Sequence, residues 1–478
     1  MSLSRYHKLQ LTPNTRFHIL SPRMQKARTN HLRKDPFLPP GPKGMPFLGS
    51  LIDYFSDMLG FLTRVSEEYG DIVYYKLGSR KMYLLNNPEH IKDVLVTNNR
   101  NFEKSRALKR TKIVLGEGLL TNEGDPHIKQ RRTIQPVFHH ERIRSYGDVM
   151  AEYASRVGED WQNGSVVNIH KEMMKLTLSI VSKTIFDSDM ESESDEIGQS
   201  LTDLVSLFPR MIFPYSEYLD DIPLPANRRF QNAKSKLDKI IYAMIEERKR
   251  NPGTRNDLLS MLLEAQDDEG DGSGMTDLQV RDEALTLFLA GQESTANSLV
   301  WTWYLISTHP QVENKIHEEI ESVLNGRLPT LDDLGKLSYT QNVFKEALRL
   351  YPPAWAVARQ VKEDYEVGGY VVPAGADIFM SQYVVHRDPR LYKEPDRFIP
   401  ERWDSDETEN LPRFAYFPFG GGTRRCIGEP FAWMEGVILI ATIASKWKMR
   451  LVPHQKIVPQ ALITIRPKNG MNMILERR

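Results

Sequence analysis

The stretch Phe419-Gly-Gly-Gly-Thr-Arg-Arg-Cys426-Ile-Gly428 holds the only cysteine in a chain of 478 residues. A single cysteine cannot form an internal disulfide. The glycines let the backbone pass close to a flat, bulky partner, and amide groups of a loop that enters a helix can donate hydrogen bonds to a sulfur anion. Arg424 and Arg425 add positive charge, which lowers a thiol pKa. The loop therefore favours a metal-binding thiolate over the alternative, a buried and inert thiol.

The spacing of residue types in this loop resembles that of a known family. The pattern Phe-x-x-Gly-x-Arg-x-Cys-x-Gly is met at Phe419, Gly422, Arg424, Cys426 and Gly428. It is similar to the haem-ligand loop of the cytochrome P-450 monooxygenases of the soluble type, in which a cysteine thiolate holds the haem iron. The resemblance implies haem b (iron protoporphyrin IX) as cofactor, Cys426 as the iron ligand, and Phe419 and Gly420 beside the haem.

The composition predicts one large globular unit. Apolar residues make up 40% and charged residues 26% of the chain, with 63 basic and 63 acidic side chains, values that exclude a disordered chain. We find no long linker after residue 50 and no internal repeat, so residues 36–478 are expected to form a single catalytic domain. No apolar run reaches the roughly 18 residues needed to span a bilayer. No nucleic-acid partner and no transmembrane segment are expected.

The N-terminal segment differs from the rest of the chain. Residues 1–34 contain eight Lys or Arg and no Asp or Glu. The segment has no apolar core of a secretory signal, but its composition is compatible with a transit peptide or with weak attraction to anionic lipid. We expect residues 1–35 to be a flexible, solvated extension of a cytoplasmic protein. The proline-rich residues 39–46 that follow resemble the hinge at the start of the family's catalytic domain.

Local patterns predict many helices and a few strands. Residues 71–77 and 81–85 flank a Gly-Ser-Arg turn and are typical of a hairpin, and residues 365–380 form a second hairpin-like stretch. Asn87-Pro88-Glu89 gives a cap, a proline and an acid in the order that begins a helix. The expected fold is mainly α with a small β-rich lobe, and the resemblance implies a helical triangular prism around the haem.

A long helix is predicted after Thr276-Asp-Leu-Gln279, a capping-box pattern. Because no proline follows until Pro310, one helix of roughly 32 residues is allowed. Gly291 and Glu293 interrupt the apolar sequence at its middle, and in isolation Glu293 can be assigned to a solvent-facing side. The resemblance implies another interpretation.

The segment Ala290-Gly291-x-Glu293-Ser294-Thr295 matches the family's Ala-Gly-x-acid-alcohol segment over the haem. There the small residues leave room for dioxygen, and the acid and the alcohol deliver protons. The family most often has threonine where this chain has Ser294. Thr295 is an alternative carrier of the hydroxyl, although one residue is a 100° step around a helix.

Glu346 and Arg349 are spaced to pair on one helix face. Alone, such a pair is usually a solvent-exposed ion pair that contributes little to stability. The resemblance implies a buried structural network instead, completed by Arg402 from Pro400-Glu-Arg402-Trp403. Arg397 has nearly the same sequence context and is held in reserve.

Haem propionates need cationic or hydrogen-bonding partners when buried. The resemblance places His127, where the family more often has tryptophan, beside Arg131, and adds Arg359 and Arg424. Taken singly, each of these arginines is more typical of a solvated surface.

Substrate contacts are expected in residues 102–120, 207–218, 354–357 and 461–463 and in the long helix before Gly291. These segments are largely apolar, which predicts a hydrophobic substrate such as a fatty acid, terpenoid, steroid or polyketide. Arg106, Lys109 and Arg110 are candidates to anchor a carboxylate.

The leading function implied by the resemblance is activation of dioxygen and insertion of one oxygen atom into the substrate. A separate ferredoxin or flavodoxin-type partner is expected to supply two electrons near Arg424 and Arg425. A peroxide-using peroxygenase or isomerase of the same fold, or a non-catalytic haem-binding protein, remain the alternatives.

Overall fold

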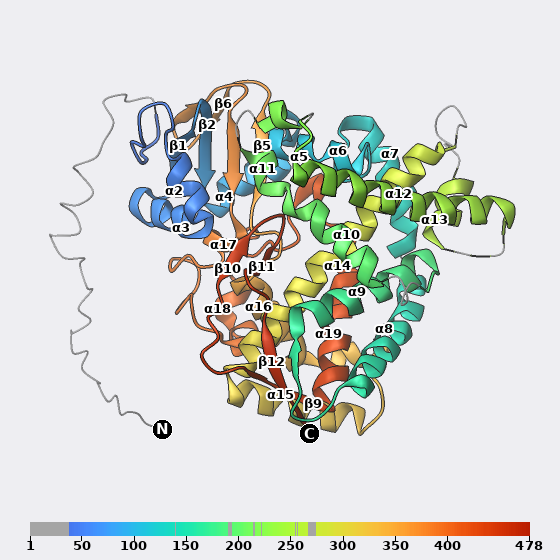
Figure 1. Ribbon diagram of the computed structural model, residues 1–478. Coiled ribbons are helices and arrows are strands. Elements are labelled where there is room, and N and C mark those ends of the chain that lie inside the picture. Colours follow the sequence, from blue (N-terminus) through green and yellow to red (C-terminus); the bar gives the residue numbers. More distant parts are fainter. Residues whose placement is uncertain are drawn as a thin grey trace, which may run out of the picture.

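The computed structural model describes residues 38–138, 140–189, 194–213, 216–220, 222–253, 255, 257–265 and 274–478. The basic extension predicted for residues 1–35 lies outside the described residues. The described part is a mainly helical body with a β-rich lobe at one corner (Figure 1), as the sequence predicts. Among the described residues, no helix combines the length and hydrophobicity that crossing a bilayer requires.

The lobe contains a five-stranded sheet in the order β1-β2-β8-β5-β3. Its strands are β1 (Ile72–Leu77), β2 (Arg80–Leu85), β3 (Phe102–Lys104), β5 (Val357–Val361) and β8 (Asp377–Met380). β1 and β2 form the predicted antiparallel hairpin, with Ile72 opposite Leu85. The sheet joins residues 72–104 to residues 357–380, because β8 pairs with β2 in parallel and with β5 antiparallel.

The second predicted hairpin is shorter than expected. It comprises β6 (Tyr365–Val367) and β7 (Tyr370–Val372), which turn at Gly368-Gly369. Residues 377–380 leave this hairpin and join the large sheet as β8, so the predicted extent of residues 365–380 is wrong. After β2, the Asn87 side chain accepts a hydrogen bond from the Glu89 amide at 2.9 Å and begins helix α4 (Pro88–Lys92), as predicted.

The long central helix is α14 (Asp277–Ser307), 31 residues that begin with the predicted capping box of Thr276 and Gln279. It runs through the helical body against α9 (Ile169–Phe186), α12 (Pro225–Arg250), α16 (Ser338–Leu350) and α19 (Glu429–Ala444). Its first half, residues 280–289, belongs to one buried apolar cluster and its second half, residues 296–306, to another. The polar middle of α14 therefore lies between the two cores.

The remaining elements complete the body around α14. The other α-helices are α2 (Leu51–Ser56), α3 (Met58–Tyr69), α5 (Arg106–Arg110), α6 (Lys112–Leu115), α7 (Gly124–Ile134), α8 (His140–Asp160), α10 (Ser194–Ser206), α11 (Phe208–Ile212), α13 (Leu258–Glu264), α15 (Pro310–Leu324), α17 (Gln382–Val385) and α18 (Asp406–Glu409). The short 3-10 and π segments are η1 (Asp93–Thr97, a π-helix), η2 (Asn99–Asn101), η3 (Gln135–Phe138), η4 (Ser216–Leu219), η5 (Leu331–Lys336), η6 (Pro400–Asp404) and η7 (Gly422–Arg424).

Two small sheets are formed mainly by the strands that follow α19. One has the order β4-β12-β9, made of β4 (Val166–Asn168), β9 (Trp447–Leu451) and β12 (Asn472–Arg477). The other is the hairpin of β10 (Pro459–Ala461) and β11 (Ile465–Pro467). This hairpin contacts α14: Nε1 of Trp301 in α14 donates a hydrogen bond to the Ile465 carbonyl at 3.0 Å.

Candidate active site

The cysteine loop is closed by its own backbone. The Cys426 amide donates a hydrogen bond to the Phe419 carbonyl at 2.9 Å, and α19 begins three residues after the cysteine. Gly422 has a φ of 66°, and a β-carbon there would overlap the carbonyl oxygen of Leu95 in η1. The sequence predicted that the glycines admit a flat partner, but Gly422 is required by this contact with the protein's own backbone. Gly420 has open space around it.

The Cys426 thiol is exposed to solvent. The surrounding protein nevertheless raises its pKa by burial, and the Gly428 amide and the guanidinium groups of Arg131 and Arg425 act in the opposite direction. The expected lowering of the thiol pKa by positive charge is present for Arg425, and burial exceeds it. The net pKa shift of the thiol in the protein is therefore upward.

The middle of α14 exposes one narrow face. Ala290 is exposed and Gly291 and Ser294 are partly exposed, although the residues on either side of this stretch are buried. Positions i and i+4 share a helix face, so Ala290 and Ser294 lie one above the other. The Ser294 hydroxyl donates to the Ala290 carbonyl at 2.7 Å. Gly291 also allows α14 to approach α9, since a β-carbon there would lie 2.7 Å from Cγ2 of Val181.

Glu293 and Thr295 point away from this face and are both buried. The Glu293 carboxylate accepts a hydrogen bond from the Thr464 hydroxyl at 2.8 Å, and burial raises its pKa. Thr295 lies near Glu435 of α19, a fully buried carboxyl whose pKa burial raises to about 8. Sequence reasoning missed Thr464 and Glu435. Glu435 was detectable as a lone acid within the apolar helix 431–444, whereas Thr464 carried no signal.

Basic side chains gather between β3, α7, β5 and the cysteine loop. The predicted members are His127, Arg131, Arg359 and Arg424, and the structure adds Lys104, which the sequence analysis missed. Arg131 links α7 to the loop by donating to the Arg425 carbonyl at 2.9 Å. Arg424 pairs with Glu123 and donates to the Asn122 carbonyl at 2.8 Å.

This cluster has a surplus of positive charge. Burial, with Arg424 as the next cause, lowers the pKa of His127 to about 3, of Lys104 to about 7 and of Arg359 to about 10. Glu123 is the acid that opposes these shifts at Lys104 and Arg359. Further negative charge would stabilise such a cluster. Two propionate groups have the charge and the hydrogen-bonding chemistry that it needs, so the residues present fit a haem.

Glu346, Arg349 and Arg402 come together in the core. The Glu346 carboxylate accepts from Nε and Nη2 of Arg349 at 2.9 and 2.8 Å and from Nε of Arg402 at 2.9 Å. Trp403 Nε1 and the Ile399 amide also donate to it, at 3.0 and 3.2 Å. The Arg397 side chain is 68% exposed and pairs with Glu394, so the reserve candidate is outside the network.

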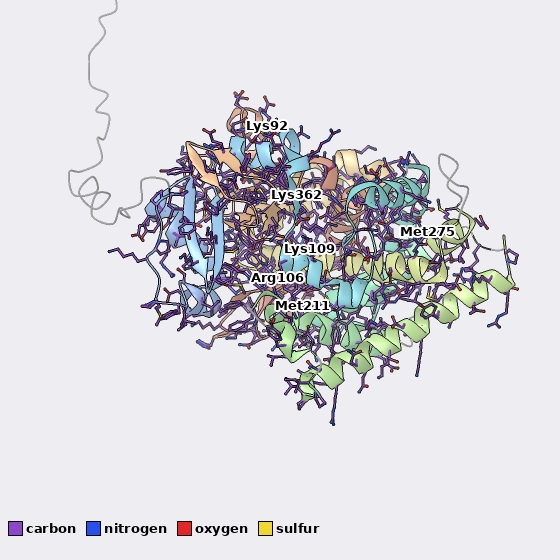
Figure 2. All side chains as sticks on the ribbon, turned by 90° about the horizontal axis from the view of Figure 1, so that it is seen from above. Lys92, Arg106, Lys109, Met211, Met275 and Lys362 are labelled. Atoms are coloured by element: carbon purple, nitrogen blue, oxygen red, sulfur yellow. The ribbon has the colours of Figure 1, made fainter. Side chains whose placement is uncertain are left out.

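The cations proposed as a carboxylate anchor already have acidic partners. Arg106 pairs with Glu217, Lys109 with Glu103 at 2.5 Å, and Arg110 with Asp220 at 2.7 Å. The pairs of Arg106 and Arg110 join α5 to η4 and the residue after it, and the pair of Lys109 joins α5 to β3. Figure 2 shows Arg106, Lys109 and Met211 close together in this part of the molecule. The fatty-acid anchor therefore has no support in the structure.

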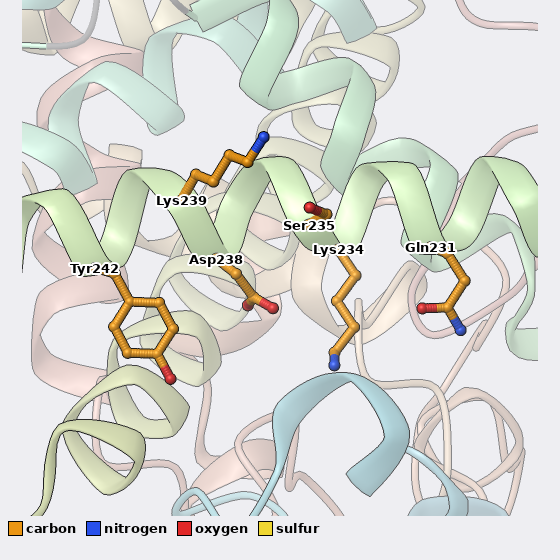
Figure 3. A pocket seen from close by; sticks show the side chains of 6 residues that line it. All are labelled: Gln231, Lys234, Ser235, Asp238, Lys239 and Tyr242. Atoms are coloured by element: carbon orange, nitrogen blue, oxygen red, sulfur yellow. The ribbon is translucent and has the colours of Figure 1, made fainter.

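A hollow on the surface lies along α12 and is shown in Figure 3. Its volume is about 410 Å³, and its lining residues are Gln231, Lys234, Ser235, Asp238, Lys239 and Tyr242. None of them belongs to the cysteine loop or to α14, so this hollow is separate from the candidate site.

The family model of cytochrome P450 matches residues 39–472. The chain belongs to the cytochrome P450 family. Cyclooctatin synthase of Streptomyces melanosporofaciens is 38% identical over 457 residues, which cover 95% of this chain and 98% of that protein. Pentalenene oxygenase of Streptomyces avermitilis is 33% identical over 91% of this chain and 97% of that protein. The solved structure of a cyanobacterial CYP120A1 with bound retinoic acid superposes with a TM-score of 0.83 at 24% identity, covering 92% of this chain and 99% of that one.

These comparisons confirm the predicted fold and class. The chain has the cytochrome P450 fold and is a P450 monooxygenase. Membership of the family implies a haem cofactor, dioxygen as co-substrate and a redox partner. α14 packs against α19, the helix that follows Cys426, so the exposed face of α14 and the exposed thiol belong to adjoining elements.

Proposed function

We propose that this P450 holds haem b through the Cys426 thiolate and binds the two propionates with the basic cluster. The residues assigned to the propionates are His127, Arg131, Arg359 and Arg424, with Lys104 added from the structure. Ala290, Gly291, Phe419 and Gly420 are assigned to the haem surroundings. The observation that carries the proposal is a partly buried cluster with more cations than acids beside a solvent-open thiol.

When bound, the haem supplies reductive activation of dioxygen. The chain's own residues supply the protons and position the substrate. We assign the alcohol role to Ser294, because it shares the exposed face of α14 with Ala290, whereas Thr295 is buried towards Glu435. Glu293 is assigned as the proton donor, since burial keeps its pKa raised and favours the protonated acid.

A neutral terpenoid is the proposed substrate class. Two relatives are named as enzymes of terpenoid oxidation, cyclooctat-9-en-7-ol 5-monooxygenase, 36% identical over 414 residues, and pentalenene oxygenase. In this chain the cations near α5 are already paired with acids, which favours an uncharged ligand over a fatty acid. Trp355 donates to the Leu462 carbonyl at 3.0 Å and joins two of the predicted contact segments, residues 354–357 and 461–463.

The electron donor is proposed to be a separate ferredoxin or flavodoxin-type protein that docks near Arg425, whose side chain is 56% exposed. Residues 36–478 are proposed to be one catalytic domain of a cytoplasmic protein. The absence of a membrane-spanning helix from the described residues is consistent with that location.

The test is the absorption spectrum of the dithionite-reduced protein under carbon monoxide, compared with Cys426→Ala. We expect the red-shifted Soret band of a thiolate-ligated carbonyl haem in the wild type and its loss in the variant. Circular dichroism controls for folding of the variant. A histidine-type spectrum in the wild type would refute the ligand assignment. Product analysis with terpenoid and fatty-acid panels, and a surrogate ferredoxin pair, then tests the substrate class.

A further inference from the structure

The acid of α14 is tethered to a distant part of the chain. The Thr464 hydroxyl donates a hydrogen bond to Oε1 of Glu293 at 2.8 Å and accepts one from Nδ2 of Asn297 at 3.0 Å. Because a hydroxyl has one proton, and the Asn297 amide occupies its acceptor side, the direction of the bond to Glu293 is fixed. All three side chains are at least 94% buried.

Thr464 is itself held in a rigid position. It lies in the turn between β10 and β11, and both sides of the turn are fastened to the core. Trp355 Nε1 donates to the Leu462 carbonyl, and Trp301 Nε1 donates to the Ile465 carbonyl, each at 3.0 Å. The Ile465 amide donates to the Pro353 carbonyl at 3.1 Å. The hydroxyl is therefore preorganised to receive Glu293 rather than carried by a free loop.

The tether separates the acid from the alcohol. Ser294 directs its hydroxyl proton to the Ala290 carbonyl, and Glu293 is bonded to Thr464. Among the described residues, these two neighbours share no hydrogen bond. A proton that passes between them must therefore cross through water or follow a side-chain rotation, and the starting position of Glu293 controls that transfer.

We propose that Thr464 is a positioning residue for the monooxygenase reaction, which holds the Glu293 carboxyl in the place from which it supplies protons to the oxygen-binding side of α14. This inference rests on the proposed roles of Glu293 and Ser294. The overall reaction consumes dioxygen, two electrons and two protons, puts one oxygen atom into the substrate and releases the other as water. If proton supply is misplaced, dioxygen leaves with the same two electrons and two protons as hydrogen peroxide.

Two other ionisable groups adjoin this cluster. Arg466 of β11 lies close enough to lower the pKa of Glu293, and His170 of α9 has its pKa lowered to about 4 by burial and by Arg466. Arg466 and His170 are retained in all the variants below. A change in the pH dependence of peroxide release in Thr464→Val is therefore attributed to the loss of the Thr464 hydroxyl.

The test compares Thr464→Val, Thr464→Ser and Thr302→Val. Valine keeps the shape of threonine and removes the hydroxyl, and serine restores the hydroxyl. Thr302 is the matched control, since it is buried on α14 and its hydroxyl donates only within the helix, to the Ser298 carbonyl at 2.7 Å. The first readout is the infrared band of the protonated Glu293 carboxyl, identified by its loss in Glu293→Gln and followed over pH.

Removal of the hydroxyl should shift this band to higher wavenumber and raise the pKa of Glu293, because the Thr464 hydrogen bond lowers it. The second readout is the fraction of consumed dioxygen released as peroxide. We expect roughly a tenfold rise in Thr464→Val, with a changed pH profile, and values near wild type in Thr464→Ser and Thr302→Val.

An unchanged infrared band in Thr464→Val would overturn the tether. A shifted band with unchanged peroxide release and pH profile would overturn the positioning role. If the wild type gives no thiolate spectrum and consumes no dioxygen, the proposed function fails separately, because the infrared measurement needs no turnover.

Discussion

Arg402→Ala is expected to destabilise the protein strongly, and Arg397→Ala is its matched control. The two arginines lie five residues apart in nearly the same sequence context. The Arg402 side chain is 5% exposed and donates three hydrogen bonds, to Glu346 at 2.9 Å and to the carbonyls of Lys393 and Glu394 at 3.0 and 3.3 Å. The Arg397 side chain is largely exposed and pairs with Glu394.

The magnitude follows from what the substitution leaves behind. Arg402→Ala leaves the fully buried Glu346 carboxylate with Arg349 as its remaining cationic partner and leaves two carbonyls without their donor. Removal of one partner from a buried ionic network costs about 3–5 kcal/mol. With a urea m value of about 4 kcal/mol per molar, scaled up from small domains, the unfolding midpoint should fall by roughly 1 M.

The assay is urea unfolding of both variants and the wild type, followed by circular dichroism, together with the haem content of each purified protein. Arg397→Ala should unfold at the wild-type midpoint, since its main-chain carbonyl, which accepts from Arg349 at 3.1 Å, is unaffected. The reasoning is refuted if the two variants unfold at the same urea concentration, or if Arg397→Ala unfolds at a lower urea concentration than Arg402→Ala.

Three further outcomes are expected. Gly422→Ala should lower haem incorporation far more than Gly420→Ala, because both require a positive φ but a β-carbon at 422 also overlaps the Leu95 carbonyl; equal haem content in the two variants would contradict this. The pKa of Glu435, about 8 in the folded protein against 4.5 for the free side chain, means that the folded state keeps a proton that the unfolded state loses as pH rises, so stability falls between pH 4.5 and 8. Glu435→Gln should remove that loss, a gain of about 4 kcal/mol at pH 8 that is absent at pH 4, and parallel stability curves of variant and wild type would exclude it. Ser294→Ala should raise peroxide release roughly tenfold and Thr295→Val much less, and the reverse order would assign the alcohol role to Thr295.

Local signals predicted the elements that local chemistry determines. The capping box at Thr276, the cap at Asn87 and the tight turn after Leu77 each depend on neighbours within a few residues, and each is present, although the turn comprises residues 78–79 and Arg80 already belongs to β2. The extent of the second hairpin was wrong because β8 prefers partners from another part of the chain, β2 and β5. A strand pattern gives no information about which strand lies beside it.

The candidate site shows the same division. The residues of α14 and of the cysteine loop were found from their spacing, whereas the side chains of Thr464, Glu435 and Lys104 act through contacts that span between 16 and 171 positions of sequence. The sequence shows the adjacent arginines, of which Arg425 lowers the thiol pKa, but it does not show the burial that opposes this effect. Desolvation is a property of the packed structure and has no sequence pattern of its own.

The exposed thiol of Cys426 is the only sulfhydryl group in the chain. A thiol-reactive dye added to the protein therefore has a single possible target. The number of dye molecules bound per chain equals the fraction of molecules in which the Cys426 sulfur is not bound to haem iron. The same property makes site-specific labelling simple. When Cys426 is bound to haem iron, one cysteine introduced on the surface is the single reactive thiol, and no native residue has to be replaced.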